Sequence, residues 1–327
     1  MSRPGPDGGS VVLVVGASSG IGRATAHALA RRGDHLVLVS RSPAVLAEVA
    51  RECARLGPEP LVAVADVTDR PAVDRAVTAA VARHGRLDAV VHTAAVLAYG
   101  RFQDIPPEVF DRVVDVDVLG AANVARSALR RFEEQGGGHL VLVGSLLGTI
   151  PTAWMSPYVV SKWAVHGLAN VLRAEARQVG ADVSLVVPGG VDTPIYALAG
   201  SYAGRAGRPP PPVDRPETVA RAIVRTLDHP RRVRSVGRAN GAWTLVFRAF
   251  PPLYDRVVGP AMARLGLSRT RAAANPGNVF DPVPAGEAVH GQWGRHWLRG
   301  VGLVGVTAGV LSAGRAARAA RGRDRLR

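Results

Sequence analysis

The sequence predicts an α/β protein built on a doubly wound parallel sheet, and two observations carry this prediction. Short apolar runs rich in valine or leucine alternate with helical patterns through the first 200 residues. A glycine-rich turn follows the first of these runs directly. Apolar runs of this kind are typical of strands buried on both faces, and their alternation with helices predicts a three-layer αβα arrangement.

Each expected element follows from its own run of residues. Strands are expected at 11–15, 36–39, 61–64, 89–92, 140–143, 183–187 and near 232–236. Helices are expected at 22–32, 44–55, 71–84, 113–131 and 216–227. The compact part of the chain closes around residues 237–240, so we expect a domain over residues 1–240.

Residues 241–327 differ in texture and are expected to form a mainly helical C-terminal extension. The extension begins with a helical stretch interrupted by prolines, at 243–267. A loop rich in glycine and proline follows at 273–286, and then an apolar run at 301–313.

Composition places the chain among globular proteins of a reducing compartment. Of its 327 residues, 47% are hydrophobic and 20% are charged, which is typical of a folded domain. Cys53 is the only cysteine, and this excludes a disulfide framework. The apolar run at 11–15 is too brief for a secretory signal. We therefore expect a cytoplasmic protein.

The net charge of +15 lies entirely in the last third of the chain. Residues 201–327 hold 22 arginines against 7 acidic residues, whereas the earlier residues balance. A basic surface can serve a nucleic acid, an anionic membrane or an anionic ligand. The sequence shows no nucleic-acid module and no interleaved aromatic stripe, which argues against nucleic acid.

Lys162 is the only lysine among 41 basic residues. In an arginine-rich chain, one lysine marks a position where a compact ammonium differs from a planar guanidinium. Tyr158 stands four residues earlier, which places both side chains on one face of a helix. A tyrosine beside a fixed ammonium loses its proton more easily than its reference pKa of about 10 allows. The pair is therefore a candidate general acid/base.

The turn after the first strand indicates a dinucleotide site of the Rossmann fold. Its glycines have the spacing Gly16-x-x-x-Gly20-x-Gly22 and open a helix. Glycines at such a turn let the backbone approach a pyrophosphate, and the helix N-terminus supplies N–H groups. The intervening Ser18, Ser19 and Ile21 are expected to contact the cofactor as well.

Arg41 ends the second strand at the place where an acidic residue usually binds the ribose 2′-hydroxyl of NAD. An arginine there can pair with a 2′-phosphate, which favours NADP over NAD. The alternative is a solvated loop charge. After the third strand, Asp66 and Val67 are candidates for contact with the adenine, although an aspartate at a strand end is also an ordinary turn residue.

These motifs, in this order, resemble the short-chain dehydrogenase/reductase family over roughly residues 10–240. Besides the glycine turn and Asp66-Val67, the chain has Ser145 at the end of a strand, 13 residues before Tyr158. Tyr158-x-x-x-Lys162 follows, and then Pro188-Gly189 with Thr193. The resemblance implies an NAD(P)-dependent oxidoreductase that transfers hydride between nicotinamide and a ketone/secondary alcohol pair.

The resemblance also implies roles for individual residues. Tyr158 would be the general acid/base, Lys162 would lower its pKa and hold the nicotinamide ribose, and Ser145 would polarise the reacting oxygen. The nicotinamide end would contact Ala94, Pro188, Gly189, Val191 and Thr193. Members of this family tend to form homodimers and homotetramers through the helices at 113–131 and 158–177, so we expect such an assembly.

Two departures from the family pattern bear on turnover. The chain has His92-Thr93-Ala94-Ala95 where the family usually has Asn-Asn-Ala-Gly, and we interpret His92 as a structural, hydrogen-bonding residue. Asp117 aligns with the family's catalytic asparagine, and a carboxylate there can pair with Lys162. The alternative function is therefore a cofactor-binding protein of this fold with little turnover, acting as a binding or regulatory module.

By the same resemblance, residues 192–212 form a substrate lid that holds Ile195, Tyr196, Leu198 and Tyr202. Trp154 is expected to form another wall. This apolar and aromatic lining predicts a hydrophobic ketone or alcohol as substrate, although the same residues can simply pack the lid.

The tail allows contact with a membrane surface. The apolar run at 301–313 is shorter than the about 20 residues of a full span. Six arginines among the last thirteen residues favour peripheral contact with an anionic membrane. The alternative is a helix docked on the core or on a partner, followed by a disordered basic end.

Overall fold

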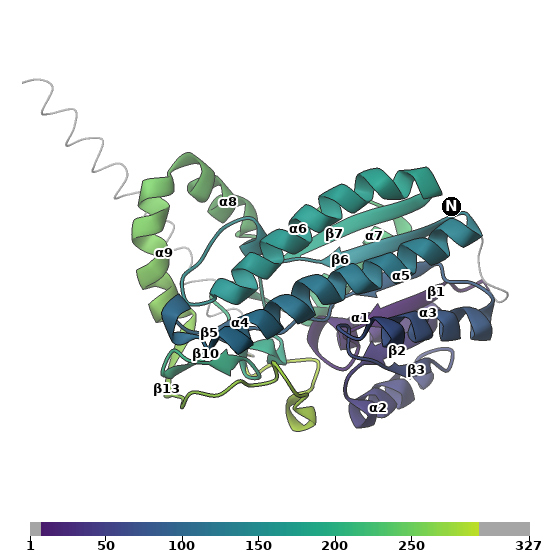
Figure 1. The fold of residues 1–327 in the computed structure, drawn as a ribbon, viewed down its shortest axis with the longest axis horizontal. Helices are drawn as coiled ribbons and strands as arrows, with labels where there is room; N and C mark the ends of the chain where they lie inside the picture. Colours follow the sequence, from purple (N-terminus) through teal and green to yellow (C-terminus); the bar gives the residue numbers. More distant parts are fainter. Residues whose placement is uncertain (1–7, 294–327) are drawn as a thin grey trace, which may run out of the picture.

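The computed structural model describes residues 8–293, and at its centre lies a seven-stranded sheet (Figure 1). The strands run in the order β12 (Val233–Val236), β7 (Ala181–Pro188), β6 (Gly138–Val143), β4 (Ala89–His92), β1 (Val11–Val15), β2 (His35–Ser40) and β3 (Leu61–Val64). All neighbouring strands are parallel. The predicted doubly wound parallel sheet is confirmed.

Helices cover both faces of this sheet (Figure 1). One face carries α3 (Arg70–His84), α5 (Gly120–Gln135) and α6 (Ser156–Ala176). The other carries α1 (Gly20–Arg32), α2 (Pro43–Ala54) and α7 (Pro216–Asp228). Because successive side chains of a strand point to opposite faces, each central strand contributes side chains to the hydrophobic cores on both faces of the sheet. In β1, for example, Leu13 packs into one core and Val14 into the other.

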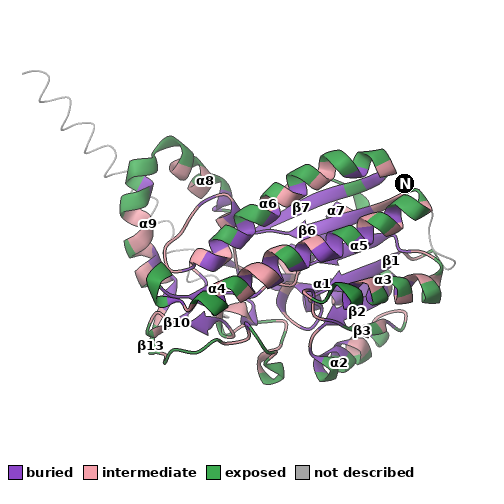
Figure 2. Cartoon of the chain, in the orientation of Figure 1, coloured by how far each residue is buried: buried purple, intermediate pink, exposed green. Residues whose placement is uncertain are grey.

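The outer strands differ from the expectation that every strand is buried on both faces. Val62 and Val64 of β3 are 37% and 53% exposed, because β3 lies at the sheet edge with only β2 beside it. At the opposite edge, β12 is also largely exposed, whereas the inner strands β6 and β7 are buried along most of their length (Figure 2). An apolar run does not reveal by itself that its strand is an edge strand.

The helix expected at 113–131 is part of a longer and irregular element. It begins as α4 (Pro107–Val114), widens into a π-helical turn over Asp115–Leu119, and continues as α5. A π turn inserts one extra residue into a helix and often lies at a functional site. Here it carries Asp117 into the buried interior.

The extension begins with two helices, α8 (Asn240–Ala249) and α9 (Pro251–Leu265). Their break at Phe250 follows from Pro251, because a residue before proline is disfavoured in a helical conformation. β13 (Leu267–Arg271) then pairs antiparallel with β10 (Arg205–Gly207) in the lid.

After β13 the chain turns back toward the sheet. We call residues 275–293 the return segment. Asn275 exchanges backbone hydrogen bonds with Ser201, and Ala288 O accepts one from the N–H of Gly20 at the start of α1. The expected apolar run at 301–313 and the arginine-rich end lie outside the described residues. Within residues 8–293, none of the helices combines the length and the apolar character that a bilayer crossing requires.

Asn240 attaches the extension to the sheet. Its side chain is buried, and Nδ2 donates to the carbonyl oxygens of Val187 and Val236 at 3.1 and 3.0 Å. These carbonyls end the neighbouring strands β7 and β12. Only glycine fits at position 189 beside the Asn240 side chain, since a Cβ at Gly189 would lie 2.7 Å from Asn240 Oδ1.

Replacing this amide should destabilise the fold. Asn240→Ala removes the amide that donates to both carbonyl oxygens and leaves Val236 O with only the N–H of Gly189, which costs about 1–3 kcal/mol of unfolding free energy. Urea denaturation followed by circular dichroism measures this loss. Asn170→Ala, at an exposed position of α6, is the matched control and should change stability by less than about 0.5 kcal/mol. Equal effects of the two substitutions would contradict the anchoring role.

Candidate active site

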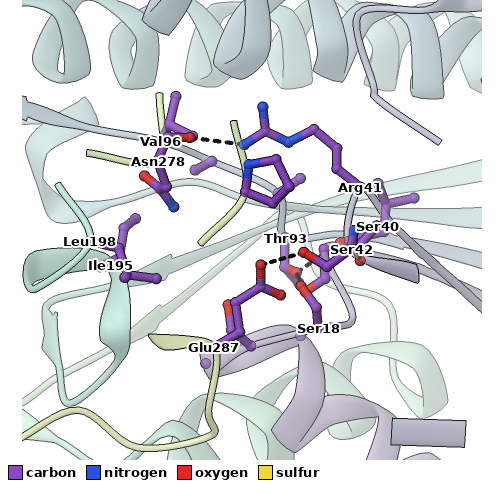
Figure 3. Close-up of a pocket in the computed structure, with 18 of the residues that line it drawn as sticks. Ser18, Ser40, Arg41, Ser42, Thr93, Val96, Ile195, Leu198, Asn278 and Glu287 are labelled. Carbon is purple, nitrogen blue, oxygen red and sulfur yellow. Dashed lines mark hydrogen bonds between the residues drawn. The ribbon is translucent and has the colours of Figure 1, made fainter. Parts of the chain in front are cut away.

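The carboxyl ends of the parallel strands meet at one edge of the sheet, where two adjoining cavities lie. The first cavity is bounded by the turn after β1 and by the end of β2 (Figure 3). Of the residues predicted to bind a cofactor, it is lined by Gly16, Ser18, Ser19, Gly20, Ile21, Gly22, Arg41, Val67, Ala94 and Thr193.

The second cavity has a volume of about 200 Å³ and lies beside the first. Of the predicted residues, it is lined by Ser145, Tyr158, Lys162, Pro188, Gly189, Val191 and Thr193. The two cavities share Ile21, Thr93, Ala95, Thr193 and Ile195 in their walls. The structure therefore brings nearly all of the predicted site residues to one continuous space.

The glycine turn is packed so closely that side chains are excluded from it. Gly16 has φ +84°, and a Cβ there would lie 2.7 Å from the N of Ala94. A Cβ at Gly22 would lie 2.0 Å from Gly16 O. No side chain therefore covers the turn at the start of α1, although the N–H of Gly20 there donates to Ala288 O at 2.8 Å. This cradle fits the pyrophosphate of a dinucleotide.

Ser145 and Tyr158 face the second cavity from two different elements. Ser145 directly follows β6, and its Oγ accepts from the N–H of Leu147 at 3.1 Å. Its hydroxyl also hydrogen-bonds Tyr158, near the start of α6, which lowers the pKa of that phenol. Ser145 thus has both the predicted catalytic position and the ordinary role of a strand-end cap.

His166 is a supporting residue that the sequence reasoning missed. Its Nε2 accepts from the backbone N–H of Ser145 at 3.4 Å. Burial, followed by the nearby charge of Lys162, lowers the pKa of His166 to about 4. The ring is therefore neutral at physiological pH and can accept this bond. Its spacing of four residues from Lys162 on α6 was the available signal.

Lys162 and Asp117 form a buried pair behind Tyr158. Lys162 Nζ lies 3.6 Å from Asp117 Oδ2, and 5.2 Å from the centre of the Tyr158 ring. Asp117 Oδ1 accepts from the N–H of Val96 at 2.8 Å. The predicted pairing of Asp117 with Lys162 is therefore present. Burial raises the pKa of Asp117 to about 6, although the lysine and the Val96 bond both oppose this shift.

The pKa of Tyr158 moves upward, opposite to the direction expected from the sequence. Burial is the largest cause, Asp117 adds to it, and the hydrogen bond from Ser145 opposes both. The expectation considered the ammonium of Lys162 alone. In the folded chain, the same interior that holds Lys162 also removes water from the phenol and places a carboxylate nearby.

His92 does not have the hydrogen-bonding role expected of it. The ring is buried at the end of β4, and neither ring nitrogen has a hydrogen-bond partner among residues 8–293. Burial, and then Lys162, lowers the pKa of His92 to about 3. His92 is therefore a neutral side chain that fills the space beside Lys162.

Arg41 and Asp66 lie where the sequence places them, but both have protein partners. The Arg41 guanidinium donates to the carbonyl oxygens of Asn278 and Phe280 at 2.9 and 2.8 Å. Asp66 Oδ2 pairs with Arg112 at 2.6 Å, and Oδ1 accepts from Thr68 in a local turn. Asp66 therefore has the turn role that was its alternative interpretation, while Val67 lines the first cavity.

The cavity walls differ in part from the expected ones. Ile195 and Tyr196 of the lid line the second cavity, whereas Leu198 lines the first and Tyr202 lines neither. The wall expected from Trp154 is formed instead by its neighbours, among them Met155. The extension supplies a further wall that sequence reasoning missed, with Trp243, Tyr254, Val257, Val258, Ala261, Met262 and Leu265.

A glycine cradle beside a Tyr–Lys pair, at the carboxyl edge of a parallel sheet, defines a nucleotide-binding oxidoreductase. A family model described as short chain dehydrogenase matches residues 10–201, which is more than half of the chain. The chain belongs to this family of NAD(P)-dependent oxidoreductases.

Curated relatives agree with this assignment. The chain is 35% identical over 270 residues to a probable oxidoreductase, EphD, of Mycobacterium tuberculosis, and the match covers 77% of this chain and 45% of that protein. The chain thus spans about half the length of this relative. It is 31% identical over 294 residues to an uncharacterized oxidoreductase, YxnA, of Bacillus subtilis, covering 88% of this chain and 82% of that protein.

Solved structures show the same fold with both nicotinamide cofactors. An alcohol dehydrogenase of Thermococcus sibiricus, complexed with 5-hydroxy-NADP, superposes with a TM-score of 0.60 at 28% identity, covering 69% of this chain and 94% of that chain. A short chain dehydrogenase of Mycobacterium paratuberculosis, bound to NAD, has a TM-score of 0.63 at 27% identity, covering 71% and 98%.

The raised pKa of Asp117 predicts a pH-dependent effect of Asp117→Asn on stability. Deprotonation of the buried carboxyl costs folding free energy, and this cost is absent below its ordinary pKa of 3.8 and complete above about pH 6. Relative to wild type, Asp117→Asn should therefore gain stability between pH 4.5 and pH 7.5, by on the order of 2 kcal/mol.

Urea denaturation at the two pH values measures this difference. Asp182→Asn, at an exposed position of β7, is the control and should show the same difference from wild type at both pH values. A pH-independent effect of Asp117→Asn would contradict the raised pKa.

Proposed function

We propose that the protein interconverts a hydrophobic ketone and its secondary alcohol, with Tyr158 as the general acid/base. The observation that carries this proposal is that Tyr158 and Lys162 line the second cavity, which shares part of its wall with the cavity of the glycine cradle. A nicotinamide cofactor bound in the first cavity supplies or accepts the hydride.

Three side chains of the site transfer the proton, polarise the carbonyl and stabilise the phenolate. Tyr158 Oη donates its proton to the ketone oxygen in reduction and takes one from the alcohol in oxidation. The Ser145 hydroxyl donates a hydrogen bond to the same oxygen and polarises the carbonyl. Lys162 places a positive charge next to the phenol and so stabilises it when the proton has left. Burial raises the pKa of Tyr158, which keeps the phenol protonated near neutral pH, the form that ketone reduction needs.

The second cavity supports an apolar substrate. Beyond the polar groups around Tyr158, its far wall is built from aliphatic side chains of α9, such as Val258, Met262 and Leu265. Tyr254 closes this wall, because its hydroxyl donates to the carbonyl oxygen of Pro151 at 2.5 Å. Apolar walls with a few convergent polar groups are typical of sites that orient a hydrophobic molecule.

Arg41 supports a preference for NADPH over NADH. β2 ends at Ser40 and is followed by Arg41 and Ser42, without the acidic residue that binds a free 2′-hydroxyl. The contacts with Asn278 and Phe280 hold the guanidinium at the first cavity and use two of its five N–H groups, and Asp66 Oδ2 lies 3.7 Å from Arg41 Nη1. Charge-assisted hydrogen bonds from such an arginine suit a phosphate group.

A homodimer or homotetramer remains a prediction, as does a cytoplasmic location. α6 supports an assembly, because Val160, Trp163 and Val171 are 50%, 44% and 55% exposed along it. Exposed apolar side chains on one helix are typical of an interface.

Tyr158→Phe should abolish most of the turnover and leave cofactor binding intact. Loss of the proton donor should lower kcat/KM for a panel of hydrophobic ketones by about 10²–10⁴-fold. The nicotinamide absorbance follows turnover, and fluorescence titration follows binding. Tyr202→Phe, a tyrosine outside both cavities, is the matched control and should retain activity. Retained activity in Tyr158→Phe would refute the assigned role, whereas binding without turnover in wild type would favour the binding-protein alternative.

Arg41→Ala should weaken NADPH binding selectively. Loss of a charge-assisted phosphate contact should raise the Kd for NADPH by about 10–100-fold and leave the Kd for NADH nearly unchanged. Fluorescence titration with each dinucleotide gives both constants, and Arg55→Ala, an exposed arginine after α2, controls for net charge. An unchanged preference would mean that Arg41 does not read the 2′-phosphate.

A further inference from the structure

The return segment forms part of the wall of the first cavity, although it lies some 250 residues from the glycine turn. Asn278, Pro282 and Glu287 of this segment all line that cavity. The segment is fixed at several points. Asn278 N donates to Leu198 O at 2.8 Å, and Trp293 N donates to Asp192 Oδ1 at 3.1 Å.

Glu287 directs its carboxylate to the end of β2. Its Oε1 accepts from the Ser42 hydroxyl at 2.5 Å, and Figure 3 shows the two side chains meeting beside Arg41. Its other oxygen, Oε2, is buried and has no hydrogen-bond partner among residues 8–293. A buried carboxylate oxygen without a donor is costly, which indicates that a donor from a ligand completes this site.

The end of β2 is the place where the adenosine ribose of a dinucleotide is read in this fold. An acidic residue there accepts hydrogen bonds from a free 2′-hydroxyl and repels a 2′-phosphate, which carries about two negative charges. This chain has no acidic residue at the end of the strand itself. The carboxylate that occupies the place comes from the return segment.

We infer that Glu287 is a specificity-determining residue for the cofactor, which favours the 2′-hydroxyl of NAD(H) and opposes the 2′-phosphate of NADP(H). The inference rests on the proposed function, since it assumes a nicotinamide dinucleotide in the first cavity. Arg41 and Glu287 then act in opposite directions on the same ribose. Arg41 favours NADPH over NADH, and Glu287 makes this preference smaller.

Two arginines lie near Glu287, and the charge of Arg41 interacts with its carboxylate. Arg23 pairs with Glu48 and Glu52 of α2, and it reaches only the backbone carbonyl of Glu287, at 3.4 Å. Ser42 holds one carboxylate oxygen of Glu287, a residue that lines the first cavity, whereas the other oxygen has no donor among residues 8–293. A purely structural role would need only the first of these oxygens.

Glu287→Gln tests the inference, because it keeps the shape of the side chain and the bond to Ser42 but removes the charge. Fluorescence titration gives the Kd of NADPH and of NADH for wild type and variant. The ratio of the two constants should shift toward NADPH by about tenfold. The adenosine fragments 2′,5′-ADP and 5′-AMP should show the same shift by calorimetry, and this readout is independent of hydride transfer.

Glu59→Gln is the control, since it removes one negative charge from an exposed position that lines neither cavity. It should leave the ratio within about twofold of wild type. Thermal unfolding shows whether each variant is folded, and Glu287→Ala provides a second variant with the same expected direction.

Two results would overturn the inference in distinguishable ways. If wild type binds both dinucleotides and Glu287→Gln leaves their ratio unchanged, or changes both constants equally, the carboxylate does not read the ribose and the proposed function stands. If wild type binds neither dinucleotide, the proposed function fails and the inference fails with it.

Discussion

Parallel pairing of the strands is the constraint on which the rest of this molecule depends. Parallel neighbours need a crossover helix each, so the chain returns to the same edge after every strand. The turn after β1, the end of β2, Ser145 after β6 and the segment after β7 therefore meet at one edge, although they are far apart in the sequence. The geometry of the candidate site therefore follows from the order of the strands in the sheet.

Burial at that edge then determines the chemistry of the charged groups. Lys162 and Asp117 are almost inaccessible to water, and burial is the largest cause of the pKa shifts of His92, Asp117 and Tyr158, with the charges of Lys162 and Asp117 as smaller causes. The extension deepens this burial, because α9 walls the second cavity and the return segment walls the first. The C-terminal extension, which the sequence places outside the Rossmann-fold domain, thus forms part of both cavities.

The sequence predicted the features that depend on local spacing, namely the strands, the glycine turn and the Tyr158–Lys162 pair on one helix face. It did not predict features that depend on distant neighbours. The edge position of β3 depends on sheet order, and the upward pKa of Tyr158 depends on burial. The π turn that carries Asp117 has no signature in residue spacing. Glu287 reaches the end of β2 from 245 positions away, so no local pattern reveals it.

The central claim is that hydride moves between the nicotinamide and the carbonyl carbon of the substrate, while Tyr158 transfers the proton. Isotope transfer tests this claim most directly. The protein is incubated with NADPH or NADH carrying two deuterium atoms at C4, together with a panel of hydrophobic ketones, and the products are examined by mass spectrometry. The account predicts an alcohol with deuterium on the former carbonyl carbon, formed by wild type and not by Tyr158→Phe. Absence of labelled alcohol from wild type that binds the cofactor, across the whole panel, would contradict it.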